Sequence, residues 1–273
     1  MITYKLDSSK QYDEMIKHTL RSYNQQFTGA VAFEARYIYA LKNDTVIGAL
    51  MIRYFWDWAT VGDVYYADLD VLKAMIQNAW QHFEKKAVGL MFFTPVKTRF
   101  NDFLKAGFKH IATIDDIGSS TYYHAQFDAK KQDTTASYPM VVNNEPIDRY
   151  QKVLDAHTPK FTQLHQIHGK SEDIQIVALQ NNQFVGGVQG EVYTDTLYIS
   201  RIAVLEANRH QAIGKTLMLK AIEEAKRRGL VVVECGTNDF QAKAFYEKLG
   251  FNAVLTRQNH PRGYNSHTMI KRL

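Results

Sequence analysis

A polar turn near residue 210 contains the residue types in this chain that best suit binding chemistry. The turn and the start of the run after it read Arg209, His210, Gln211, Ala212, Ile213, Gly214 and Lys215. If a helix begins here, several of its first backbone N–H groups lack internal partners, and the helix dipole adds partial positive charge. Gly214 allows a ligand close to the backbone, and Arg209 and Lys215 add cations, so the turn suits a pyrophosphate. The alternative is a simple turn glycine beside a solvated arginine.

Two regular elements must position this turn. Leu197–Val204 is rich in branched and aromatic residues, which favours a strand. After the turn, apolar residues recur at helical spacing with charged residues between them. Gly229 stands where a helix needs a C-terminal stop, and residues 226–228 place cations in its last turn. The stretch therefore predicts strand, turn and helix.

Two motifs in this half of the chain resemble those of the GNAT (GCN5-related N-acetyltransferase) superfamily. Residues 209–214 resemble its Q/R-x-x-G-x-G/A loop, and residues 245–251, F-Y-E-K-L-G-F, resemble its second signature. Ile202-Ala203-Val204 stands where the family has the end of its fourth strand, so the motifs occur in the family's order over roughly residues 137–273. The resemblance implies an N-acetyltransferase that moves an acetyl group from acetyl-CoA directly to a primary amine of a small molecule or peptide, without a metal.

The same resemblance implies roles for individual residues. Tyr246 matches the family's general acid, which protonates the leaving thiolate; the alternative is an aromatic that only packs between helix and sheet. The residues that it implies for acetyl-CoA binding are Ile202, Ala203, Val204, Arg209, His210, Gln211, Ala212, Ile213, Gly214, Lys215, Asn238, Asp239 and Tyr246.

Two positions in the cofactor motifs depart from the family pattern. Ala212 replaces the first glycine of the loop, and because alanine disfavours positive φ, we expect the loop to hold it at negative φ. Asp239 stands where the second signature usually has asparagine, with Asn238 one residue earlier.

The general base is a third departure. Ser200 and Arg201 occupy the place where the fourth strand often carries a glutamate, and neither is a good base at neutral pH. Glu191 is a candidate base acting through a water. His165 and His168, in the segment that lines the acceptor site in this family, are further candidates, or ordinary loop histidines.

The chain also contains an internal repeat. Residues 39–50 match residues 177–188 at an offset of 138, and residues 103–108 match 246–251 at an offset of 143. Together with the repeat, the resemblance implies the fold class α/β (α+β type mixed sheet), with two tandem GNAT-like domains, each a mostly antiparallel twisted sheet flanked by helices. We place these domains at residues 1–130 and 137–273, separated by a polar segment. The first copy has Asp68 and Asp70 at the loop and Phe103 for Tyr246, so we expect it to lack the cofactor site.

Composition narrows the class of protein. A hydrophobic content of 45% with 22% charged residues is typical of a soluble globular chain, and no apolar run approaches the ~20 residues of a membrane span. The net charge of +5 without a long basic run gives little support to a nucleic-acid partner. The single cysteine, Cys235, fits a reducing compartment, and we expect a cytoplasmic protein. Two alternatives to acetyl transfer are an acyl-CoA-binding sensor or scaffold without turnover, and transfer of a longer acyl group.

Overall fold

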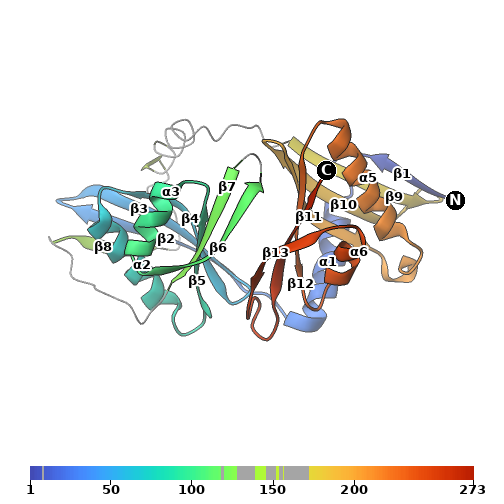
Figure 1. Cartoon of the computed structure of the whole chain (residues 1–273). Helices are drawn as coiled ribbons and strands as arrows, with labels where there is room; N and C mark the ends of the chain where they lie inside the picture. Colours follow the sequence, from blue (N-terminus) through green and yellow to red (C-terminus); the bar gives the residue numbers. More distant parts are fainter. Residues whose placement is uncertain (8, 118–119, 128–138, 146–151, 154–155, 157–171) are drawn as a thin grey trace.

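Two seven-stranded mixed sheets lie side by side in the chain (Figure 1). The structure, a computed structural model, describes residues 1–7, 9–117, 120–127, 139–145, 152–153, 156 and 172–273. Each sheet contains one parallel pair of strands, and its other pairs are antiparallel. The predicted polar linker, His165 and His168 lie outside the described residues. The sequence also predicts a helix over residues 147–156, and most of it lies outside the described residues as well.

The first sheet, which contains the predicted nucleotide turn, is built mainly from the C-terminal half. Its strand order is β1-β9-β10-β11-β12-β14-β13. The bounds are β1 Ile2–Leu6, β9 Glu172–Gln180, β10 Gln183–Tyr193, β11 Thr196–Val204, β12 Val232–Asn238, β13 Asn252–Arg257 and β14 Ser266–Arg272. β11 and β12 form the parallel pair at its centre.

The second sheet is built mainly from the N-terminal half, in the order β8-β2-β3-β4-β5-β7-β6. The bounds are β2 Phe33–Lys42, β3 Thr45–Phe55, β4 Trp58–Tyr66, β5 Gly89–Thr94, β6 Phe108–Ile117, β7 Ser120–Phe127 and β8 Val141–Glu145. The sequence predicts a hairpin with strands at residues 36–41 and 45–54, and the pairing of β2 with β3 confirms it. Its turn residues Asn43 and Asp44 take the positive φ of a two-residue hairpin loop.

The two halves exchange their first strands. β1 pairs with β9 of the C-terminal half, and β8 pairs with β2 of the N-terminal half. The sheets thereby acquire the same order of strands, with β1 in one taking the place of β8 in the other. Sheet membership therefore does not follow the division into residues 1–130 and 137–273 that the repeat suggests.

Among the described residues, helices cover both faces of the first sheet and one face of the second. The helix bounds are α1 Asp13–Thr28, α2 Leu69–Phe83, α3 Lys97–Lys105, α5 Ile213–Arg227 and α6 Lys243–Lys248. On the first sheet, α5 and α6 cover one face, where Leu217 and Phe251 are buried, and α1 covers the other through Ile16. On the second sheet, α2 and α3 cover one face, and Val153 packs on the other. The amphipathic helices are thus explained by burial of their apolar stripes.

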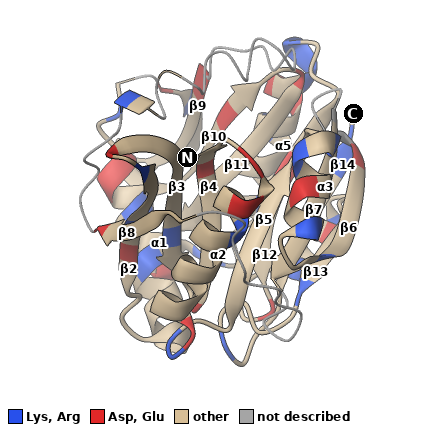
Figure 2. Ribbon diagram, turned by 90° about the vertical axis from the view of Figure 1, so that its left-hand side faces the viewer, with Lys and Arg blue, Asp and Glu red and all other residues tan. Residues whose placement is uncertain are grey.

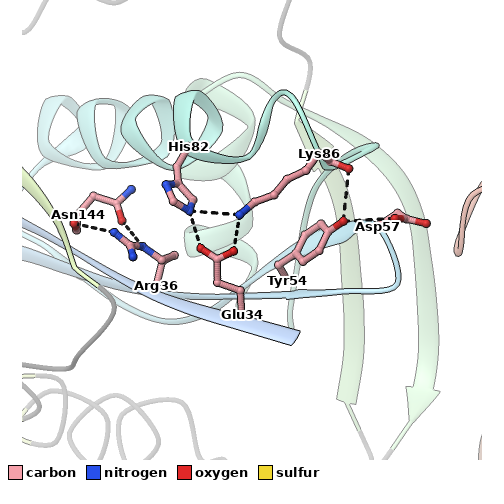
Figure 3. A network of polar contacts seen from close by, with 7 residues as sticks. All are labelled: Glu34, Arg36, Tyr54, Asp57, His82, Lys86 and Asn144. Atoms are coloured by element: carbon pink, nitrogen blue, oxygen red, sulfur yellow. Dashed lines mark hydrogen bonds and ion pairs between the residues drawn. The ribbon is translucent and has the colours of Figure 1, made fainter. Parts of the chain in front are cut away.

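A polar network fastens the end of α2 to its sheet (Figure 3). His82 and Lys86 both contact the carboxylate of Glu34 on β2. Tyr54 donates a hydrogen bond to Asp57 at 3.2 Å, and the other oxygen of Asp57 accepts from the backbone of Arg262 at 3.1 Å. The network thus reaches from the N-terminal sheet to the β13–β14 loop of the C-terminal half.

Aromatic side chains complete this junction between the halves. Trp58 on β4 donates its indole N–H to the backbone of Asn259 at 2.6 Å. Ile114 from β6 is buried with Leu255 from β13 and Ile270 from β14.

Acidic and basic residues are interspersed along the ribbon (Figure 2). No helix in the described part of the chain combines the length and apolar character that a membrane crossing requires.

Candidate active site

The first sheet opens at its centre. β11 and β12 pair only from Thr196↔Val232 to Ile199↔Cys235, although β11 continues to Val204 and β12 to Asn238. The opening begins at a β-bulge: Gln189 faces Arg201 and Gly190 faces Ile199, which leaves Ser200 as the extra residue. A bulge increases local twist and bends its strand, so it accounts for the divergence of β11 from β12.

A cavity of about 720 Å³ occupies this opening. On one side of the sheet it is lined by Ile213 and Gly214 at the start of α5 and by Phe245 and Tyr246 of α6. On the other side it is lined by residues of α1, including Tyr23. Because α1 and α5 pack on opposite faces, the cavity connects both faces through the gap between the strands. We call it the groove.

The predicted nucleotide turn lies at one end of the groove. Within the described residues, none of the backbone N–H groups of residues 210–215 donates a hydrogen bond to the protein. α5 begins at Ile213 with no side-chain cap. A run of unpaired N–H groups at a helix start, with the dipole behind it, is an anion site.

The expectation of negative φ at Ala212 is wrong. Ala212 has φ 57° and ψ 10°, in the left-handed region, and His210 has φ 63°. The turn needs these angles because they swing successive N–H groups toward one side of the backbone. Alanine tolerates the conformation at a cost of ~1–2 kcal/mol, which the rest of the turn must offset.

The basic residues of the turn differ in position. Arg209 lines the groove, but its guanidinium lies over the ring of Tyr23, 5.0 Å from the centroid. Lys215 lines the groove and is exposed. The two cations therefore flank the unpaired N–H groups, one held by an aromatic ring and one in solvent.

Tyr246 is buried at the base of the groove, 5% exposed. Burial raises its pKa well above the usual value, with the neighbouring Cys235 thiol as a further cause. Burial also raises the pKa of Cys235. The phenol is therefore protonated at neutral pH and able to donate a proton, whereas the thiol is a poor nucleophile.

Several residues predicted for the site do not line the groove. Gln211 is exposed, and Glu191 is exposed on β10 opposite Tyr198. Asn238 is buried beneath the turn before α6, and its N–H donates to Gln241. Asp239 contacts His267 at 2.7 Å and accepts from the backbone of Asn265, and the His267 contact is the main cause that lowers its pKa. This carboxylate therefore joins the turn to β14.

The wall contributed by α1 is absent from the sequence prediction. Thr19, Leu20 and Tyr23 line the groove. The Tyr23 hydroxyl donates to the backbone of Phe240 at 2.9 Å, and Asn24 accepts from Gln241 at 2.8 Å. The sequence predicts a helix that contains Ile16 and Leu20, but nothing local to it indicates that it packs on the C-terminal sheet. The internal repeat is the one sequence feature that relates the two halves.

The second sheet has the same opening, filled by its own side chains. β4 and β5 pair from Trp58↔Gly89 to Thr60↔Met91 and no further. Asp68 caps α2 by accepting from the Val71 N–H at 3.0 Å, so it occupies an amide donor that an anion would need. Tyr66 donates to Asp102 at 2.9 Å across the position of the groove, with the half-buried Arg99 beside it.

With this geometry in place, comparison with known proteins identifies the class of domain. Residues 139–251 match the acetyltransferase (GNAT) family. The chain is 25% identical over 133 residues to blasticidin-S acetyltransferase of Streptomyces morookaense, covering 46% of this chain and 98% of that protein. It is 28% identical over 101 residues to the [ribosomal protein bS18]-alanine N-acetyltransferase of Haemophilus influenzae, covering 36% and 69%. A solved acetyltransferase from Bacillus cereus is 26% identical, with a TM-score of 0.42, covering 47% and 98%.

The C-terminal half of the chain is therefore a GNAT acetyltransferase domain. Through this domain the chain is an enzyme of the acyltransferase class, an N-acetyltransferase.

Proposed function

We propose that the chain binds acetyl-CoA in the groove and transfers its acetyl group directly to a primary amine that enters from the α1 side. The observation that carries this proposal is the groove itself, which passes between β11 and β12 and has unpaired N–H groups at one end and Tyr246 at its base. Family membership supplies the cofactor, because GNAT domains use acetyl-CoA.

The proposed binding mode assigns the two ends of acetyl-CoA to different groups. The pyrophosphate accepts hydrogen bonds from the N–H groups of residues 210–215, with Arg209 and Lys215 supplying charge. The pantetheine arm lies along Ile202–Val204, whose backbone has no partner strand on the β12 side. The thioester then reaches the gap between the strands, where the acceptor approaches from the opposite face.

The chemical step needs positioning and two proton transfers. The amine nitrogen attacks the thioester carbonyl, and the C–S bond breaks as the amide forms. Tyr246 gives its proton to the departing thiolate and regains one from solvent. The amine loses its proton through water. Glu191 remains the candidate base for that step. It is exposed on β10 and faces Tyr198 on β11. The residue after Tyr198, Ile199, lines the groove.

We further propose that the chain is a tandem duplication in which only the C-terminal copy binds cofactor. In support, the two sheets share one strand order, a bulge before the central opening, and the opening itself. The N-terminal copy carries Asp68 and a Tyr66–Asp102 pair at the positions that cofactor would occupy. The domains proposed are residues 1–130 and 137–273 in sequence, with their first strands exchanged.

Calorimetric titration with acetyl-CoA tests the binding proposal. We expect saturable binding at one site per chain, and loss of at least about tenfold in affinity for Arg209→Glu. Asp68→Asn serves as the matched control, because it alters the N-terminal counterpart of the turn and leaves the groove unchanged. The absence of saturable binding, or equal affinity in Arg209→Glu, would refute the proposal.

The main alternative is an acyl-CoA sensor or scaffold, favoured by the position of Glu191 outside the groove lining. Release of free thiol in the presence of a panel of amines separates the two. An enzyme releases CoA faster with at least one amine than without it, whereas a sensor stays at the rate of hydrolysis. Competition by longer acyl-CoA thioesters tests the further alternative of a longer acyl donor.

A further inference from the structure

A second cavity, of about 370 Å³, lies between the two sheets and shares no lining residue with the groove. Its walls come from β4, β5, β6 and β7 of the N-terminal sheet and from the end of β13 with residues 258 and 259. The lining residues are Trp58, Val88, Met91, Phe92, Phe93, Ile111, His124, Ala125, Gln126, Thr256, Arg257, Gln258 and Asn259. The volume falls in the lower part of the ~300–1,000 Å³ range of small-molecule pockets.

Arg257 is the single cationic side chain of this lining. Its Nη2 contacts Nδ1 of His124 at 3.0 Å, and its Nη1 donates to Thr268 at 3.3 Å. A guanidinium has five N–H donors. The remaining donors of Arg257 have no hydrogen-bond partner within the described residues.

The charge of Arg257 is also poorly balanced. Burial lowers its pKa to about 10, and it forms no ion pair within the described residues. Burial, followed by the charge of Arg257, lowers the pKa of His124 to about 3. This imidazole is therefore neutral and does not offset the charge of Arg257. Glu234 attracts Arg257 from beyond ion-pair distance, while its carboxylate accepts from Tyr193 at 2.7 Å. Arg257 is half-buried, and cations withdrawn from water in proteins are normally paired, so the site suits an anion.

The other walls combine apolar side chains, mostly of the N-terminal sheet, with polar ones such as Gln126 and Gln258. Phe93 and Ile111 are 47% and 44% exposed although they are large hydrophobic side chains. Phe93 stacks on His124 with ring centroids 5.6 Å apart, which sets an aromatic surface beside the guanidinium. One planar cation among apolar surfaces matches a ligand with one planar anionic group on an apolar body.

We propose that this cavity binds a small organic anion, one carboxylate on an apolar body of about the size of a ring. The carboxylate accepts hydrogen bonds from the free N–H donors of Arg257, and the apolar body covers Phe93 and Ile111. The ligand touches strands of both sheets, so it holds the two halves of the chain together. The site is independent of acetyl-CoA binding.

Benzoate is the probe for the test, titrated calorimetrically into the full chain. We expect saturable binding with a Kd of about 1 mM or tighter, and at least tenfold weaker binding of benzamide, which has the same ring without the charge. Arg257→Gln should weaken benzoate at least about tenfold. Arg262→Gln is the matched control, because Arg262 lies in the neighbouring loop, is exposed and does not line the cavity. It should leave benzoate binding unchanged.

A second variant covers the case in which Arg257→Gln does not fold. Ile111→Trp changes an exposed rim residue and fills the mouth of the cavity, so it should abolish benzoate binding and preserve the melting temperature. Saturating acetyl-CoA should not compete. The proposal is overturned if benzoate fails to bind, if benzamide binds as tightly, if acetyl-CoA displaces benzoate, or if Ile111→Trp binds benzoate like the unaltered chain.

Discussion

Tyr246 combines two properties that a proton donor for a thiolate needs. Its ring is fixed between Phe245 and Phe251, with centroids 5.1 and 5.6 Å away, and its hydroxyl is withdrawn from water beside Cys235. Desolvation disfavours the phenolate, so the raised pKa keeps the proton on the oxygen, as the proposed role of general acid requires. The same burial makes the ring a packing residue, so both interpretations of Tyr246 are compatible and only a change that spares the ring separates them.

Tyr246→Phe makes that change. We expect kcat for CoA release to fall about 10²-fold, because the general acid is lost, while the calorimetric Kd for acetyl-CoA stays the same. A general acid works only while it is protonated, so a raised pKa of Tyr246 moves the loss of kcat to higher pH. The unaltered enzyme should therefore not lose kcat through this group below about pH 10, the ordinary pKa of tyrosine. Unchanged kcat in Tyr246→Phe would assign the residue to packing alone.

The substitution Ala212→Gly tests whether the left-handed conformation of residue 212 lowers the free energy of unfolding. In Ala212→Gly the left-handed strain of ~1–2 kcal/mol disappears, and the unfolded chain gains freedom worth ~0.4–1 kcal/mol. We expect the free energy of unfolding to rise by up to about 1 kcal/mol in chemical denaturation. Ala207→Gly is the control, because Ala207 is exposed in the same connection and does not have positive φ. That substitution should destabilise, and equal effects at both sites would contradict the strain.

At the scale of elements, α1 packs on the sheet of the GNAT domain although it lies at the other end of the sequence. Ile16 is fully buried against β9 and β10 residues such as Val177 and Phe184. A Cβ added at Gly187 would lie 2.6 Å from Ile16, so the helix sits directly on the strand. The position of Tyr23 and its partner Arg209 therefore depends on packing at Ile16.

Ile16→Ala should lower the free energy of unfolding by about 2–4 kcal/mol, because it leaves a cavity under α1. It should also weaken acetyl-CoA binding, because α1 then holds the wall of the groove less firmly. Met15→Ala, one residue away and 43% exposed, should change stability by less than about 0.5 kcal/mol. Denaturant melts and calorimetry on the two variants check this. An effect on stability without one on binding would separate α1 from the groove.

Local sequence patterns predicted individual elements well. Gly229 has φ 72° at the end of α5, as its position after the cationic turn indicates. The sequence also predicts helices over residues 69–86 and 97–106, and α2 and α3 begin at the predicted Leu69 and Lys97. Two features had no local signal. The bulge at Ser200 depends on register against β10, and the pairing of β1 with β9 depends on which of two similar sheets a strand reaches. Both are set by tertiary contacts, which propensity and periodicity do not encode.

For the whole molecule, the exchange of first strands makes each half depend on the other. The family match covers residues 139–251, a continuous stretch, yet the groove is closed by residues 19–23 of the distant N-terminus. Within the same stretch, β8 pairs with β2 of the N-terminal sheet. Under the proposed duplication, the exchange of strands gives a reason for keeping a copy without a cofactor site: the N-terminal half delivers α1 to the groove and receives β8 in return.

Fragments of the chain test this dependence. Residues 137–273 alone lack β1 and α1, so the apolar face of β9 and β10 is uncovered and β9 has a free edge. We expect this fragment to aggregate or to melt without cooperativity, and to show no saturable acetyl-CoA binding. Joining residues 1–28 through a flexible glycine–serine linker to residues 172–273 restores both elements, and should return acetyl-CoA affinity to within about tenfold of the full chain. Because the two fragments are of similar length, size alone does not account for a difference between them. If residues 137–273 fold and bind acetyl-CoA like the full chain, the exchange is not needed for the site.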